Sequence, residues 1–227
     1  FGVVTKFWFA PHPLPPSRNV TTYVSTFNTG DAAAVTLAWQ AWLGADLDSR
    51  VSTKLVFHTN NIEVVGVFFQ DGPGAGDELR SLLAPLTSAA PAAQPLNVTS
   101  WPWMEAAFML AGCDGLGSCE HGSTRAAWKG KSAYVSKPGL SREGISVVET
   151  WMFIRSLNNT KAFAGAMFDG YGGRVEDAGS SAASRAGDRG AFAHRSALFG
   201  VQLIEYWFHG HDDPQQSLVW VRDFAAA

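Results

Sequence analysis

The sequence predicts an α+β fold in which a large antiparallel sheet of about seven strands carries helices packed on one face. Runs typical of strands come in adjacent pairs as often as singly, which favours antiparallel pairing. Stretches with apolar residues at helical spacing lie between them. The chain has 227 residues, of which 46% are hydrophobic. It is therefore long enough to bury a core of its own.

The strands are expected at 3–9, 21–27, 52–58, 62–69, 96–100, 128–135, 162–169 and 198–206. Thr59-Asn60-Asn61 separates the third and fourth, which is typical of a hairpin. Along the last strand, alternation places Gln202 and Tyr206 on one face and Leu203 and Glu205 on the other. That polar pair among apolar neighbours fits either a polar-substrate face or a half-solvated strand, and the pattern alone favours neither.

Helices are predicted at 29–42, 79–86, 102–110 and 147–154 and after Asp213. Asp213 before Pro214 is a typical helix start, with aspartate as N-cap and proline in the first turn. Ser100 is expected to cap the helix that follows Trp101-Pro102. The run DGPGAGDE at 71–78 is predicted to be a loop.

Composition excludes several classes of function. Charged residues make up only 16% of the chain, against about 25% in typical domains, and the 17 basic residues form no run. A nucleic-acid partner is therefore not expected. No apolar stretch approaches the length of a membrane span, so no membrane partner is expected either. The glycine fingerprint of dinucleotide sites and the Gly-x-Ser-x-Gly motif of hydrolases are both absent from the sequence.

Two cysteines and three sequons point to an oxidising compartment. Cys113 and Cys119 lie in the short run GCDGLGSC, which favours a disulfide, with a pair of free thiols as the alternative. Asn19, Asn97 and Asn158 each begin an Asn-x-Thr sequon and are predicted glycosylation sites. The protein is accordingly expected to be secreted.

Other polar groups give weaker signals. His209, His211 and Asp212 have a spacing that can ligate a metal, but a polar loop before the last helix is the favoured interpretation, and no metal is expected. Asp169, Glu205 and Glu149 are candidate carboxylates for glycoside chemistry, although nothing in the sequence pairs them. His194-Arg195 is interpreted as a structural pair that ties a loop to the backbone.

Five segments together resemble the berberine-bridge-enzyme-like FAD-linked oxidases of the vanillyl-alcohol-oxidase superfamily. In the family's order along the chain they are FGVVTKFWF, WKGKSAYV, FDGYGGRV, GAFAHRSALFGVQLIEYW and LVWVRDF. The resemblance implies an oxidase that transfers a hydride from an alcohol or sugar hydroxyl carbon to flavin, with O₂ as acceptor. It leans toward carbohydrate or hexose oxidases.

The resemblance also implies a division of the chain. Residues 1–10 would end the FAD-binding domain, with Phe1, Gly2 and Val3 touching the cofactor, and 11–227 would form the substrate-binding domain. The FAD is expected to be bound mainly by a portion that precedes Phe1, which would be the partner of this chain. The catalytic base is expected beyond Ala227, so no catalytic residue is assigned, and the chain alone is expected to be inactive.

Within the substrate-binding domain, the resemblance assigns Gln202 and Asp169 to hydrogen bonds with substrate, with Tyr171 and Tyr206 as further candidates. The substrate would be a small molecule such as a sugar. Met167 stands where some oligosaccharide oxidases carry glutamine. Asp169 has a second interpretation, in which it only caps the Asp-Gly turn.

Two rival hypotheses remain at this point. In one, the chain is a non-catalytic secreted glycoprotein module that keeps the fold without flavin. In the other, it is a secreted glycoprotein whose likeness to the oxidases is accidental.

Overall fold

The computed structural model describes residues 5, 6, 8, 17–45, 47–111, 113, 127–157, 163–172, 193–208 and 212–227. Seven strands form one sheet with the order β4-β1-β3-β2-β6-β7-β5, in which every neighbouring pair is antiparallel. The strands are β1 (Asn19–Phe27), β2 (Val51–Phe57), β3 (Ile62–Phe68), β4 (Asn97–Pro102), β5 (Ala127–Ser136), β6 (Phe163–Gly170) and β7 (Ala197–Trp207).

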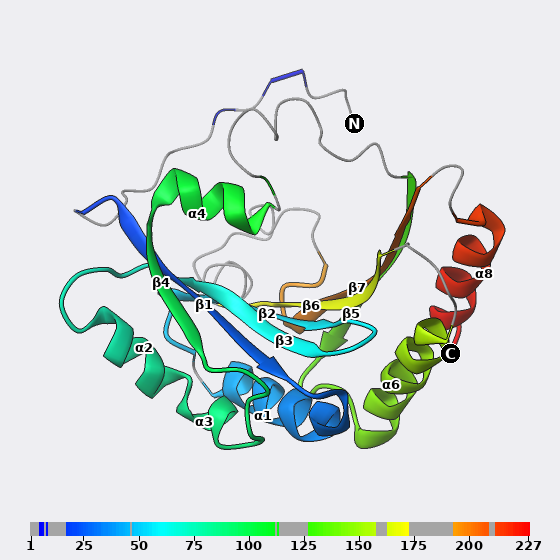
Figure 1. Ribbon diagram of the computed structural model, residues 1–227, viewed down its shortest axis with the longest axis horizontal. Helices are drawn as coiled ribbons and strands as arrows, with labels where there is room; N and C mark the ends of the chain where they lie inside the picture. The colour runs from blue at the N-terminus through cyan, green and yellow to red at the C-terminus, as the bar shows by residue number, and fades with distance from the viewer. Residues whose placement is uncertain are drawn as a thin grey trace.

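Most helices cover one side of this sheet. The described helices are η1 (Thr29–Asp31), α1 (Ala32–Gly44), α2 (Ala75–Leu82), α3 (Ala84–Thr87), α4 (Trp103–Leu110), α6 (Arg142–Ser156) and α8 (Pro214–Phe224). Figure 1 shows the sheet curved, with α1, α2, α3, α6 and α8 along its convex side. The concave side faces away from these helices. None of the described helices combines the length and the apolar character that crossing a bilayer requires.

The main core lies between the convex side of the sheet and its helices. Trp39 of α1 is fully buried, and its ring centroid lies 5.3 Å from that of Phe199 on β7. Phe199 stacks in turn on Phe168 of β6. The indole Nε1 of Trp39 donates a hydrogen bond to Oγ1 of Thr53 at 3.1 Å, so that its only polar atom is satisfied.

Helix α4 is the exception to the one-sided arrangement. Its Ala106 packs in a second, small cluster with Val20 of β1 and Val67 of β3, flanked by Trp101 and Trp103. Figure 1 shows α4 above the concave side, at the β4 end of the sheet. The predicted α+β fold is therefore confirmed, and α4 forms one wall of the concave side.

Two predicted helix boundaries are wrong for identifiable reasons. A single helix at 79–86 was expected, but the structure divides it into α2 and α3 because Pro85 lies in the first turn of α3. Proline lacks an N–H and clashes with the preceding turn, so it starts a helix more readily than it continues one. The second helix also begins at Ala75, inside the predicted loop, because Asp77 and Glu78 suit the first turn next to the helix dipole.

The caps were predicted with mixed success. Asp213 accepts a hydrogen bond from the N–H of Gln215 at 2.9 Å, as expected of an N-cap. Ser100, by contrast, belongs to β4, and its hydroxyl donates to Oδ1 of Asp71 at 2.7 Å. The helix that it was expected to cap begins at Trp103. Of the strand predicted at 3–9, residues 5, 6 and 8 are described and none of them belongs to a strand, and the other four lie outside the described residues.

Candidate functional site

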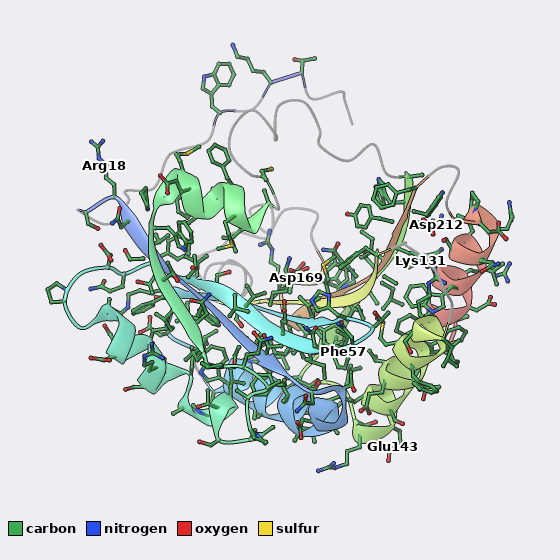
Figure 2. The ribbon with its side chains drawn as sticks, in the orientation of Figure 1. Arg18, Phe57, Lys131, Glu143, Asp169 and Asp212 are labelled. Carbon is green, nitrogen blue, oxygen red and sulfur yellow. The ribbon has the colours of Figure 1, made fainter. Side chains whose placement is uncertain are left out.

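The centre of the concave face is built by three adjacent strands. In an antiparallel pair, directly opposed residues point to the same face of the sheet. The register places Gln202 of β7 opposite Met167 of β6, and Asp169 of β6 opposite Lys54 of β2. Alternation along β6 puts Met167 and Asp169 on one face, so all four side chains share the concave side. Figure 2 shows Asp169 near the middle of that side.

These side chains form a polar chain across the strands. The Nε2 atom of Gln202 donates a hydrogen bond to Oδ2 of Asp169 at 2.9 Å. The Nζ atom of Lys54 lies 3.2 Å from Oδ1 of the same carboxylate. The predicted juxtaposition of Gln202 and Asp169 on neighbouring strands is thus confirmed. Both carboxylate oxygens of Asp169 thus contact side chains of the neighbouring strands β7 and β2. This differs from the alternative role, in which Asp169 only caps the Asp-Gly turn.

Tyr171 lies beside these polar side chains, directly after the end of β6. Gly200 makes room for it, since a Cβ atom built at Gly200 would lie 3.2 Å from the Tyr171 hydroxyl. The pKa of Tyr171 is raised, first by burial and then by Tyr134 and the negative charge of Asp169. Tyr171 therefore keeps its proton at neutral pH and can donate a hydrogen bond.

Sequence reasoning missed Tyr134 as a member of the site. Tyr134 of β5 lies opposite Gly200 and so on the concave face. Its ring stacks on His194 with centroids 4.1 Å apart and lies 6.0 Å from Tyr171. The stack gives His194 a packing role and places the imidazole beside the polar centre. The tie between His194-Arg195 and the backbone stays a prediction. Alternation in WKGKSAYV was the available signal for Tyr134.

A row of aromatic rings crosses the same face near one end of the strands. Trp128 of β5, Tyr206 of β7, Phe163 of β6 and His58 after β2 follow one another with centroid separations of 6.4, 6.1 and 5.7 Å. Trp128 is 61% exposed and Phe163 is 41% exposed. Exposed apolar side chains that lie together mark binding surfaces more often than single ones do. Of this aromatic row, only Tyr206 was predicted. It lies four residues from Gln202, about 13 Å along the strand.

The convex side carries a different kind of polar group. Glu205 is fully buried, forms an ion pair with the guanidinium of Arg155 on α6, and accepts a hydrogen bond from the Ser217 hydroxyl at 2.8 Å. Burial raises the pKa of Glu205, against the opposing effects of Ser217 and Arg155. These contacts fasten β7 to α6 and α8. Glu205 is therefore part of the scaffold and cannot act on a ligand at the concave face.

The three candidate carboxylates accordingly do not form a pair. Asp169 lies on the concave face and Glu205 is buried on the convex side. Glu149 of α6 lines a separate pocket of about 240 Å³ on the convex side, beside Phe57 and Met152. A glycosidase arrangement of two carboxyl groups around one bond is not present among these three residues.

Several predicted residues lie outside the described part of the chain. They are Phe1, Gly2, Val3, Cys119, Asn158, His209 and His211. Cys113 is described, but its predicted bond to Cys119 stays a prediction. Among the described residues, no three His, Cys, Asp or Glu side chains gather in a way that could hold a metal ion.

Comparison with solved structures places this fold among known proteins. BBE-like 1 from Physcomitrella patens superposes with a TM-score of 0.70 at 17% identity, over 92% of this chain and 43% of that one. The chain has the fold of part of this BBE-like protein. The resemblance seen in the sequence is thereby confirmed at the level of the fold. No family model and no curated protein sequence matches the chain.

Two further structures match over similar spans. The glucooligosaccharide oxidase of Acremonium strictum has a TM-score of 0.67 at 21% identity, over 92% of this chain and 43% of its own length. A variant of berberine bridge enzyme in complex with (S)-reticuline has a TM-score of 0.71 at 16% identity, over 95% and 41%. Another structure of the Acremonium strictum enzyme concerns its 6-S-cysteinyl, 8α-N1-histidyl FAD. This chain thus spans less than half the length of the proteins that it matches.

Proposed function

We propose that this chain is the substrate-binding portion of an FAD-dependent oxidase that oxidises an alcohol or sugar hydroxyl, with O₂ as the final acceptor. The observation that carries the proposal is the polar chain of Lys54, Asp169 and Gln202, exposed on the concave face of a sheet with this fold. Hydrogen-bonding groups at the middle of an open face, with aromatic rings around them, suit a hydroxyl-rich ligand.

The described residues fit the substrate side of a flavin site. The concave face offers an amide and a carboxylate held by a lysine, all three on adjacent strands, and the Tyr171 hydroxyl directly after β6. FAD, when bound, supplies the hydride acceptor and its reoxidation by O₂. This chain would contribute orientation: Gln202 binds a substrate hydroxyl, and Tyr171 donates to a second oxygen of the substrate.

The aromatic row would hold the rest of the substrate. The apolar faces of a sugar ring pack on flat side chains, and Trp128 and Phe163 present such surfaces. Packing there would also displace water from the strands next to Gln202. A substrate longer than a single ring would reach from the polar centre to the aromatic row.

The organisation expected from the sequence belongs to this proposal. Residues 1–10 would close the FAD-binding domain, residues 11–227 would form the substrate-binding domain, and the catalytic base would lie beyond Ala227. Secretion is part of the proposal as well. It is supported by the exposure of Asn97 on the edge strand β4, where a glycan would meet no neighbouring strand.

The test is to produce the intact protein that contains this chain and to record its visible spectrum. The proposal predicts flavin absorbance, together with O₂ consumption on at least one compound of a panel of D-glucose, cellobiose and benzyl alcohol. A colourless, folded protein would contradict it and favour the non-catalytic glycoprotein module. A flavoprotein that oxidises no alcohol or sugar would overturn the substrate class.

A further inference from the structure

Lys54 was not singled out by any sequence pattern, yet it ends the polar chain at the centre of the concave face. Its strand, β2, is distant in sequence from β6 and β7. The three strands come together because β2 pairs with β6, and β6 pairs with β7, in the sheet. The register sets Lys54 opposite Asp169, and its Nζ atom lies 3.2 Å from Oδ1. Both side chains are partly exposed, at 40% and 30%, so a ligand on this face can reach them.

The hydrogen bond to Asp169 fixes the orientation of the Gln202 side-chain amide. An ionised carboxylate only accepts hydrogen bonds, whereas the two ends of a glutamine amide have opposite polarity. Asp169 beside Lys54 therefore selects the rotamer of Gln202 in which Nε2 points to the carboxylate. None of the described hydrogen bonds uses Oε1 of Gln202, which is left as an acceptor for a ligand on the concave face.

Lys54 also sets the charge of the site centre. Asp169 alone would present a negative charge and attract an ammonium group, but the lysine neutralises it. On the same face, Nε2 of His58 lies 3.3 Å from Oε2 of Glu63, and this contact is an ion pair only when the imidazole is protonated. A neutral centre with one aimed acceptor suits the hydroxyl group of an uncharged substrate.

We propose that Lys54 is a positioning residue, which holds Asp169 so that Gln202 presents Oε1 to an uncharged hydroxyl substrate, and which disfavours amine-bearing ligands. This inference rests on the proposed function for the identity of the ligand. The orientation of the Gln202 amide, however, can be measured without any turnover.

The first experiment uses NMR on the intact protein labelled with ¹⁵N-glutamine, and Gln202→Ala assigns the side-chain signal. Lys54→Met is expected to move the Gln202 amide resonances, because the carboxylate loses its partner. Lys54→Arg is expected to keep them near their parent positions, since arginine retains the charge and the donors. Lys131→Met is the matched control, because Lys131 lies opposite Leu203 and so on the other face of the sheet.

The second experiment measures oxidation of the most active compound of the glucose, cellobiose and benzyl alcohol panel. Lys54→Met is expected to lower kcat/KM about threefold, the scale expected when a partly exposed charge pair is lost, with Lys54→Arg restoring most of it. D-glucosamine should inhibit Lys54→Met about tenfold more strongly than D-glucose does, because the unpaired Asp169 attracts its ammonium group.

The outcomes separate the two proposals. Unchanged Gln202 resonances in Lys54→Met, or equal perturbation by Lys54→Arg, would overturn the positioning role. Equal inhibition by the two sugars would overturn the neutralising role. If the intact protein oxidises no compound of the panel, the proposed function fails, and the NMR comparison still decides whether Lys54 positions Gln202.

Discussion

Gln202 and Glu205 lie three residues apart on β7 and point to opposite faces of the sheet, Gln202 exposed on the concave side and Glu205 fully buried against α6 and α8. One strand thus carries both a candidate ligand group and an anchor of the scaffold. Changes at the two positions should therefore separate function from stability.

Removing the partner of Glu205 should destabilise the fold. Arg155→Met would leave a buried carboxylate without its counter-charge, which typically costs about 3–5 kcal/mol. Urea unfolding followed by tryptophan fluorescence measures this cost. Arg222→Met is the control, because the Arg222–Asp223 pair is exposed and its loss should not shift the unfolding midpoint. A similar midpoint for the two variants would contradict the anchoring role.

Glu205 should also leave a signature in the pH dependence of stability. Its pKa in the folded protein is raised above the ordinary value of 4.5, mainly by burial. Between 4.5 and the raised folded pKa, the folded state binds more protons than the unfolded state, so the free energy of unfolding falls as pH rises. Glu205→Gln should remove this fall. Parallel pH profiles of unfolding for parent and variant would count against the raised pKa.

The aromatic row can be tested at its most exposed member. Trp128→Ala should raise the KM for an oligosaccharide about fivefold, equivalent to about 1 kcal/mol of lost packing, with little change in kcat. Phe153→Ala offers a matched control, because Phe153 is 62% exposed on α6, on the convex side. Steady-state kinetics with cellobiose would decide, and identical KM values for both variants would exclude Trp128 from the substrate path.

The predicted bond between Cys113 and Cys119 has a direct chemical test. Mass spectrometry of the non-reduced digest should find the two cysteine peptides linked. Because the loop is short, replacing both cysteines by serine should cost no more than about 2 kcal/mol of unfolding free energy. Two alkylated thiols in the unreduced protein would refute the pairing.

The fold was largely predictable because its signals are local. Alternation in β7 correctly assigned Gln202 and Glu205 to opposite faces, and Asp213 before Pro214 correctly marked the start of α8. Lys54 could not be found in the same way. Its role depends on β2 pairing with β6, a contact between strands that are far apart in the sequence.

The same limit applies to the other missed groups. The stack of Tyr134 on His194 joins β5 to the segment before β7, and the Arg155–Glu205 pair joins a helix to a strand. Side chains of this kind are brought together by tertiary packing, to which neither periodicity nor composition is sensitive. The division between α2 and α3 was predictable from Pro85, whose effect on a helix is local.

We propose that the concave face binds the substrate of a flavin-dependent oxidation, with Gln202 at the centre of that face. The most direct measurement is anaerobic reduction of the flavin by substrate in the intact protein, compared between parent and Gln202→Ala. We expect equal flavin content in the two proteins and, in Gln202→Ala, a transition-state free energy for flavin reduction that is higher by about 1–3 kcal/mol, because one polar partner of the substrate is removed. Unaltered reduction in Gln202→Ala, or loss of the flavin itself, would contradict it.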